Sequence, residues 1–128
     1  GGTDIGQLDE PVGLSVDRDN LLYVADTWNR RIQVFNTSGS FVRQWNMEAW
    51  FAQSNERPYL AVDSNGRLYV TDPEAFRILV FTTTGQFLYS FGDYTTITLA
   101  GGVAVDDQGR IYVSDTAAGT ILRYRAEN

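Results

Sequence analysis

One pattern occurs three times along these 128 residues, and it constrains the fold more than any other feature. Each copy has a short apolar segment ending in Asp, then an apolar segment centred on Tyr-Val, then a third apolar segment. The central segments are LYVAD at 22–26, LYVTD at 68–72 and IYVSD at 111–115. Their tyrosines are 46 and 43 residues apart. A period of this length indicates an array of repeated supersecondary units.

Each copy is predicted to consist of short β-strands joined by tight turns. The segments are rich in Val, Ile, Leu, Tyr and Phe and are bounded by turn residues. In the turn at 63–66, Asp63 caps the turn through its side chain and Gly66 accepts a left-handed backbone. A fourth strand is expected at 41–45 and at 87–91. We therefore predict four-stranded antiparallel meanders, the last of which lacks its outer strand.

The inner strands are apolar on both faces, because 22–25 and 78–81 are continuous apolar runs. A sheet with one wet face alternates, whereas a sheet covered on both sides does not. Four-stranded sheets of this length, stacked face to face around an axis, are β-propeller blades, while a β-solenoid has shorter repeats. The predicted fold class is all-β, one domain at 1–128. Its expected parts are blade 1 at about 11–46, an insertion at about 46–57, blade 2 at about 58–92 and blade 3 at about 100–128.

The first copy resembles an NHL repeat in the segments PVGLSVD at 11–17, LYVADT at 22–27 and NRRIQVF at 29–35. The second copy departs at 73–76 and the third at 117–120, where the Asn-x-Arg part is altered. The resemblance implies a propeller of six blades, of which this chain supplies three. The stretch from Trp50 to 63 is also similar to NHL regions of some bacterial membrane glycosyltransferase-like proteins. That similarity implies a bacterial protein, extracytoplasmic or attached to a membrane protein.

Three blades alone would expose two apolar faces and an unpaired strand edge, which are association sites. Two copies related by a two-fold axis would close a six-bladed ring with identical seams. We therefore expect a homodimer in which the chain is its own partner. The alternative is an excised or engineered propeller fragment without a standalone function, which the Gly1-Gly2 start without Met also suggests.

Composition restricts the functional class. The net charge is −6 and the ten basic residues are scattered, which argues against nucleic-acid binding. The chain has no Cys and no His, so the commonest general base and metal ligand is missing. No apolar run is long enough for membrane insertion. We expect a non-enzymatic binding or scaffold module with no catalytic residues, metal or cofactor. The alternative is part of a metal-dependent propeller hydrolase or lyase, with Ca²⁺ in the channel left open.

Residues that break the repeat are better site candidates than residues that serve it. In a propeller, the loops between second and third strands and the connections between blades share one face. Trp, Tyr and Arg on such a face are typical of binding hot spots, and Trp also suits sugars, so a protein or carbohydrate ligand is expected. The candidate ligand-binding residues are Trp28, Asn29, Arg30, Trp50, Phe51, Glu74 and Phe76, with Tyr94 in the next connection. Alternatively, 47–52 forms a short helical plug that packs Trp50 and Phe51 onto the blades.

Recurring charged residues are expected to serve the fold. One set of aspartates begins the tight turns and is expected to cap them, far apart on separate blades: Asp17, Asp63 and Asp106. A second set closes the second strands and is expected to accept bonds from loop amides: Asp26, Asp72 and Asp115. Arg31 and Arg77 precede the third strands and are expected to bond a neighbouring Asp or carbonyl.

Overall fold

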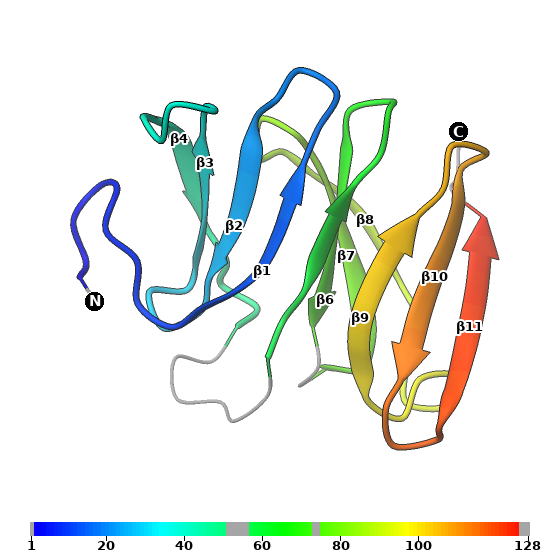
Figure 1. Cartoon of the computed structure of the whole chain (residues 1–128). Coiled ribbons are helices and arrows are strands. Elements are labelled where there is room, and N and C mark those ends of the chain that lie inside the picture. Colours follow the sequence, from blue (N-terminus) through cyan, green and yellow to red (C-terminus); the bar gives the residue numbers. More distant parts are fainter. Residues whose placement is uncertain (1, 51–56, 73–74, 126–128) are drawn as a thin grey trace.

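The computed structural model describes residues 2–50, 57–72 and 75–125, and these contain eleven strands in three antiparallel sheets (Figure 1). Blade 1 consists of β1 (Pro11–Val16), β2 (Leu22–Asp26), β3 (Arg31–Phe35) and β4 (Phe41–Asn46). Blade 2 consists of β5 (Leu60–Val62), β6 (Arg67–Asp72), β7 (Arg77–Thr82) and β8 (Phe87–Phe91). Blade 3 consists of β9 (Ala100–Val105), β10 (Arg110–Asp115) and β11 (Thr120–Arg125). The all-β prediction, with a three-stranded last blade in the described residues, is confirmed.

The strands of each sheet lie in chain order, so every sheet is a meander. The first strands, β1, β5 and β9, contact one another across the blades, so they lie nearest the common axis. β4 and β8 lie at the outer rim, and the three sheets stand side by side as an open arc (Figure 1).

The turn after each first strand is held by the aspartate that begins it. Asp17 accepts the amides of Asp19 and Leu21 at 2.8 and 2.9 Å through Oδ1, and the Tyr23 hydroxyl donates to Oδ2 at 2.7 Å. Two further turns repeat these bonds, at Asp63 with Tyr69 and at Asp106 with Tyr112. The repeated Asp and Tyr are therefore one device that ties the turn to the second strand.

Each blade has two faces, because side chains alternate along a strand. We call the face toward the next blade in sequence the leading face, and the opposite one the trailing face. The leading faces of blades 1 and 2 bury the same residue types completely: Tyr23, Ile32 and Val34, and Tyr69, Ile78 and Val80. They pack on the trailing faces of blades 2 and 3, which present Leu68, Val70 and Leu79, and Ile111, Val113 and Leu122. Two apolar cores, one per seam, hold the arc together.

The two end faces lack a covering blade and keep part of the apolar pattern, with Gln33 on blade 1 and Arg123 on blade 3 at positions that are apolar in the internal seams. Ile121 on the leading face of blade 3 is 68% exposed, whereas its repeat equivalent Ile78 is 0% exposed. Leu14 on the trailing face of blade 1 is 65% exposed, whereas its equivalent Leu60 is 5% exposed. Equivalent side chains therefore differ in burial because one of each pair lacks a neighbouring blade.

We predict that Ile78→Ala lowers the free energy of unfolding by about 2–5 kcal/mol, because it opens a cavity in the seam between blades 2 and 3. Leu88→Ala is the control, since Leu88 on the outer strand is 39% exposed and should cost much less. Urea unfolding followed by tryptophan fluorescence measures both. Equal losses for the two variants would contradict the packing described above.

Candidate functional site

The loops of the candidate site lie at one end of the strands. The β2–β3, β6–β7 and β10–β11 loops and the β4–β5 and β8–β9 connections all meet this end, at the bottom of Figure 1. We call this end the loop face. The arrangement matches the expectation drawn from the repeat.

A buried carboxylate fixes the loop face of blade 1. Asp26 is fully buried, and its Oδ2 accepts from Nε of Arg31 at 2.6 Å while its Oδ1 accepts from the amide of Asp9 at 2.7 Å. The terminal nitrogens of Arg31 donate to main-chain carbonyls of the preceding segment, those of Thr3, Asp4 and Gln7, at 2.7–3.0 Å. Asp26 accepts a loop amide, and Arg31 bonds a neighbouring aspartate and carbonyls, as the sequence predicted.

The other blades vary this arrangement. In blade 2, Nε of Arg77 donates to Oδ2 of Asp72 at 3.0 Å. Blade 3 has Thr120 in place of the arginine, and Asp115 accepts the amides of Thr98 and Leu99 at 2.7 and 3.1 Å. The aspartate is therefore the constant part, and the arginine of blade 1 also binds carbonyls of the preceding segment.

The β2–β3 loop holds three of the predicted site residues. Asn29 donates to Asp26 at 3.0 Å and to the Gly2 carbonyl at 2.7 Å, so its amide group is occupied within the fold. Arg30 donates through Nη2 to the Glu48 carbonyl at 3.0 Å, which links this loop to the β4–β5 connection. Trp28 is 44% exposed and remains available at the surface.

Trp50 lies in the core and not at the surface, which corrects its assignment as a displayed binding residue. It is 3% exposed, packs in the seam between blades 1 and 2, and donates through Nε1 to the Thr71 carbonyl at 3.4 Å. Residues 48–49 form a turn and not the start of a helix, so the predicted plug is not helical in its described part. Phe51 and Glu74 lie outside the described residues.

Phe76 is displayed from a backbone position that favours glycine. Its φ is 59°, and the equivalent residues Arg30 and Gly119 have φ values of 53° and 70°. A left-handed backbone costs about 1 kcal/mol or more for most side chains, so glycine would suit the turn better. Phe76 is nevertheless kept there and is 36% exposed.

Tyr59 was missed by the sequence reasoning, although it carries a usable signal. It stands where the other copies have Gly13 and Gly102, so it breaks the repeat. Tyr59 precedes β5 at the loop face and is 39% exposed, and Tyr94 in the β8–β9 connection is 78% exposed. The described aromatic side chains exposed at the loop face are therefore Trp28, Tyr59, Phe76 and Tyr94.

At the opposite end of the strands, the turn-capping aspartates come together. Asp17, Asp63 and Asp106 line one pocket of about 250 Å³, which corrects the expectation that they lie far apart. The reason is that β1, β5 and β9 converge near the axis and carry all three turns to the same place. Their carboxylates already accept turn amides and tyrosine hydroxyls. Within the described residues, no group of three acidic, His or Cys side chains is arranged to hold a metal ion.

Hydrogen bonds and burial shift the pKa of Asp106 and of Tyr23 at this end of the strands. Burial opposes ionisation of Asp106, but bonds from the amide and the guanidinium of Arg110 outweigh it and lower its pKa to about 2. Burial and the bond to Asp17 raise the pKa of Tyr23 to about 12. At neutral pH the Asp106 carboxylate therefore accepts and the Tyr23 hydroxyl donates.

Comparison with known families supports the resemblance noted above. The sequence model of the NHL repeat matches residues 8–35. The chain carries an NHL repeat. A search of curated proteins finds no match. No helix among the described residues is long and apolar enough to cross a membrane.

Solved structures confirm that the sheets are β-propeller blades. A streptogramin B lyase is 20% identical with a TM-score of 0.65, over 98% of this chain and 42% of that chain. A catalytically inactive histidine variant of virginiamycin B lyase from Staphylococcus aureus is 16% identical with a TM-score of 0.64, over 90% and 41%. A gluconolactonase from Xanthomonas campestris is 24% identical with a TM-score of 0.60, over 85% and 36%. This chain thus spans about two fifths of the propellers it matches.

These neighbours correct the prediction that the protein is not an enzyme. The lyases and the gluconolactonase have the same fold, so this architecture is compatible with catalysis. Missing His and Cys residues were the basis of the prediction, but these three blades match less than half of each of those enzymes. Catalytic groups of a full ring can lie on other blades, so the composition of this chain does not exclude catalysis.

The lowered pKa of Asp106 predicts acid sensitivity of the fold. Because the folded-state pKa lies below the ordinary value of 3.8, the stabilisation is complete above that value and is lost as the pH falls toward 2. Asp106→Asn should therefore flatten the dependence of the unfolding free energy on pH between about 4 and 2. Asp107→Asn is the control, and a pH profile of urea midpoints is the measurement. An unchanged slope in Asp106→Asn would show that this carboxylate is not linked to folding.

Proposed function

We propose that this chain is a ring-building recognition module, three blades that pair with those of a second copy to form a six-bladed propeller. Its loop face then becomes part of a continuous ligand-binding surface. The exposure of Ile121 and Leu14, each equivalent to a fully or almost fully buried residue in an internal seam, carries the proposal. The proposed ring assembly is the same whether the completed ring only binds its ligand or also catalyses a reaction on it.

Both end faces present apolar side chains at repeat positions that are buried in the internal seams. The leading face of blade 3 presents Ile121, the equivalent of Ile32 and Ile78, which both fill an internal seam. The trailing face of blade 1 presents Leu14 and Val16, the equivalents of Leu60 and Val62. A seam between copies would therefore repeat these apolar contacts of the internal seams. Burying each such side chain contributes about 1.5–3 kcal/mol.

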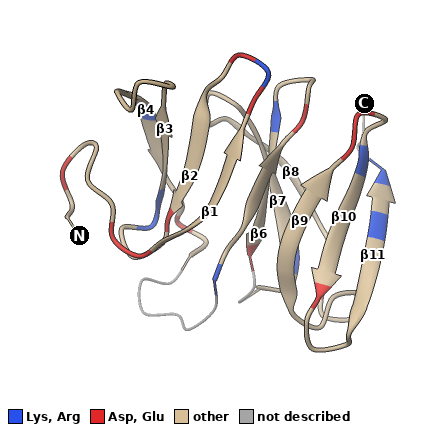
Figure 2. Ribbon diagram, in the orientation of Figure 1, with Lys and Arg blue, Asp and Glu red and all other residues tan. Residues whose placement is uncertain are grey.

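The two end faces also match in charge. Arg123 and Arg125 on β11 are exposed, and they give β11 its blue colour in Figure 2. Arg123 stands where the buried leading faces have Val34 and Val80. The segment before β1 is acidic, with Asp4, Asp9 and Glu10 and no basic residue. Opposite charges on the two ends favour a head-to-tail pairing that a two-fold axis closes into a ring.

Recognition is assigned to the loop face because exposed aromatic side chains gather there from several loops. Trp28 and Phe76 come from two different blades, and Tyr59 and Tyr94 come from the connections between blades. Aromatic side chains supply large contact areas at low entropic cost. This supports a protein or carbohydrate ligand.

We predict that Ile121→Glu and Leu14→Arg each abolish the concentration dependence of the melting temperature seen for the unchanged chain, because each adds a charge of the same sign as the end face opposite it. Mass action makes the melting temperature of a dimer rise with protein concentration, and a charge in the seam removes the pairing. Val42→Arg on the outer strand β4, which is 39% exposed, is the matched control. A melting temperature that is independent of concentration in the unchanged chain would contradict the proposal.

A further inference from the structure

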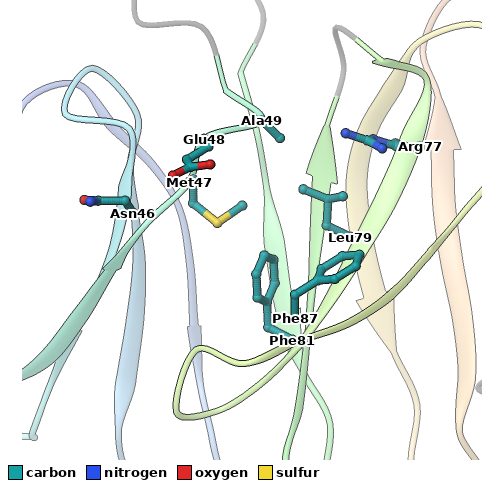
Figure 3. Close-up of a pocket in the computed structure, with 8 residues that line it drawn as sticks. All are labelled: Asn46, Met47, Glu48, Ala49, Arg77, Leu79, Phe81 and Phe87. Carbon is teal, nitrogen blue, oxygen red and sulfur yellow. The ribbon is translucent and has the colours of Figure 1, made fainter.

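The seam between blades 1 and 2 contains a pocket that the ring assembly does not use. It has a volume of about 280 Å³, smaller than the roughly 300–1,000 Å³ typical of drug-sized ligand sites. It is lined by the end of β4 and the following turn, by β7 and by the start of β8: Asn46, Met47, Glu48, Ala49, Arg77, Leu79, Phe81 and Phe87 (Figure 3). A pocket of this size suits a small metabolite.

The interior of the pocket is apolar. Met47, Leu79 and Phe81 are 1%, 4% and 8% exposed, and they belong to the packed core or border it. Phe87 stacks edge-on against Phe81 with ring centroids 5.6 Å apart, and it is 53% exposed. An apolar group that enters the pocket would therefore meet fixed side chains and would cover Phe87.

The charged end of the pocket contains Arg77, which Figure 3 shows on the opposite side from Glu48. Nε of Arg77 donates to Asp72 at 3.0 Å, and this bond orients the guanidinium. No described residue accepts a bond from its terminal nitrogens. Arg31, its repeat equivalent, uses both terminal nitrogens on carbonyls and on the Gln44 side chain. Arg77 therefore keeps a two-nitrogen fork that fits a carboxylate.

The turn that carries Glu48 is fixed by the fold. The Met47 amide donates to the Arg30 carbonyl at 2.7 Å, and Nη2 of Arg30 donates to the Glu48 carbonyl at 3.0 Å. The main chain on this side of the pocket is therefore held before any ligand arrives. A carboxylate placed on this rim favours a ligand that is positive there and disfavours one that carries only negative charge.

We propose that this pocket binds a free amino acid with a large apolar side chain, phenylalanine or leucine in type. The ligand carboxylate pairs with Arg77, its ammonium group faces Glu48, and its side chain packs on Leu79, Phe81 and Phe87. A zwitterion satisfies both rim charges, whereas a simple acid or a simple amine satisfies one. The pocket lies within a single chain, so the proposal does not depend on ring assembly.

The test is isothermal titration calorimetry with L-phenylalanine, L-phenylalaninamide and 3-phenylpropionate. We expect a dissociation constant on the order of 1 mM for phenylalanine and at least about tenfold weaker binding of the other two, since each lacks one charged group. Equal affinity for phenylalanine and its amide would overturn the role of Arg77. Heat without saturation up to about 20 mM phenylalanine, well above the affinity expected for so small a ligand, would overturn the site.

Variants separate the pocket from general effects on folding. Phe87→Ala and Arg77→Gln should each weaken phenylalanine binding about tenfold or more. Phe41→Ala is the matched control, because Phe41 pairs with Phe35 at the equivalent place in blade 1, outside the pocket. Glu48→Gln should reduce the preference for phenylalanine over 3-phenylpropionate. Unchanged binding in Phe87→Ala would contradict the proposal.

The same titration on Leu14→Arg distinguishes this inference from the ring proposal. Binding that persists in Leu14→Arg supports a site within one chain, whatever the assembly state. Loss of binding in this variant, with the fold intact by circular dichroism, would contradict a pocket that is complete in one chain.

Discussion

Face-to-face packing between blades is the interaction on which the rest of the structure depends. Each blade is a thin sheet with apolar side chains on both faces, so it cannot bury them alone. Ile32 and Ile78 are fully buried because a following blade covers them. The turns that Asp17, Asp63 and Asp106 cap set the start of each second strand, and the Tyr hydroxyls lock that start in place. The spacing of the blades and the placement of the described turns follow from this packing and these caps.

Hydrogen bonds at the edges of the seams fix how neighbouring blades are aligned. Arg43 donates from β4 to the Thr83 carbonyl of blade 2 at 2.9 Å, and the Val62 amide donates to Ser15 of blade 1 at 3.2 Å. Apolar contact is not directional, whereas these bonds form at one alignment of the blades only. The arc is therefore built as a fixed geometry, and the loops at its ends are held in register with one another.

The fold was predictable because the same turn and strand residues appear three times. Each copy supports the strand assignment of the other two. Residues that depend on neighbouring blades were less predictable. Trp50 breaks the repeat as Trp28 does, yet Trp50 is buried in a seam and Trp28 is exposed. Sequence position alone does not say which aromatic side chain of an insertion faces a seam. The gathering of three aspartates at one pocket depends on the convergence of β1, β5 and β9, which local pattern does not specify.

The exclusion of enzymes failed for a related reason. It was drawn from residue types missing in 128 residues, whereas propeller chemistry belongs to a ring of which this chain matches about two fifths. The architecture is therefore a better guide to where a site forms than to what reaction it performs. What the end faces require is clearer, because both internal seams fully bury the equivalents of Ile121, and Leu60, the equivalent of Leu14, is only 5% exposed.

The most direct test of this account is the molar mass of the unchanged chain in solution, measured by light scattering after size exclusion over a concentration series. The account predicts a mass of twice the 14.3 kDa of one chain, as expected for two sets of three blades in one ring. A mass of 14.3 kDa at all concentrations, together with a cooperative thermal transition, would contradict it. That result would mean that the exposed end faces are stable in water without a partner.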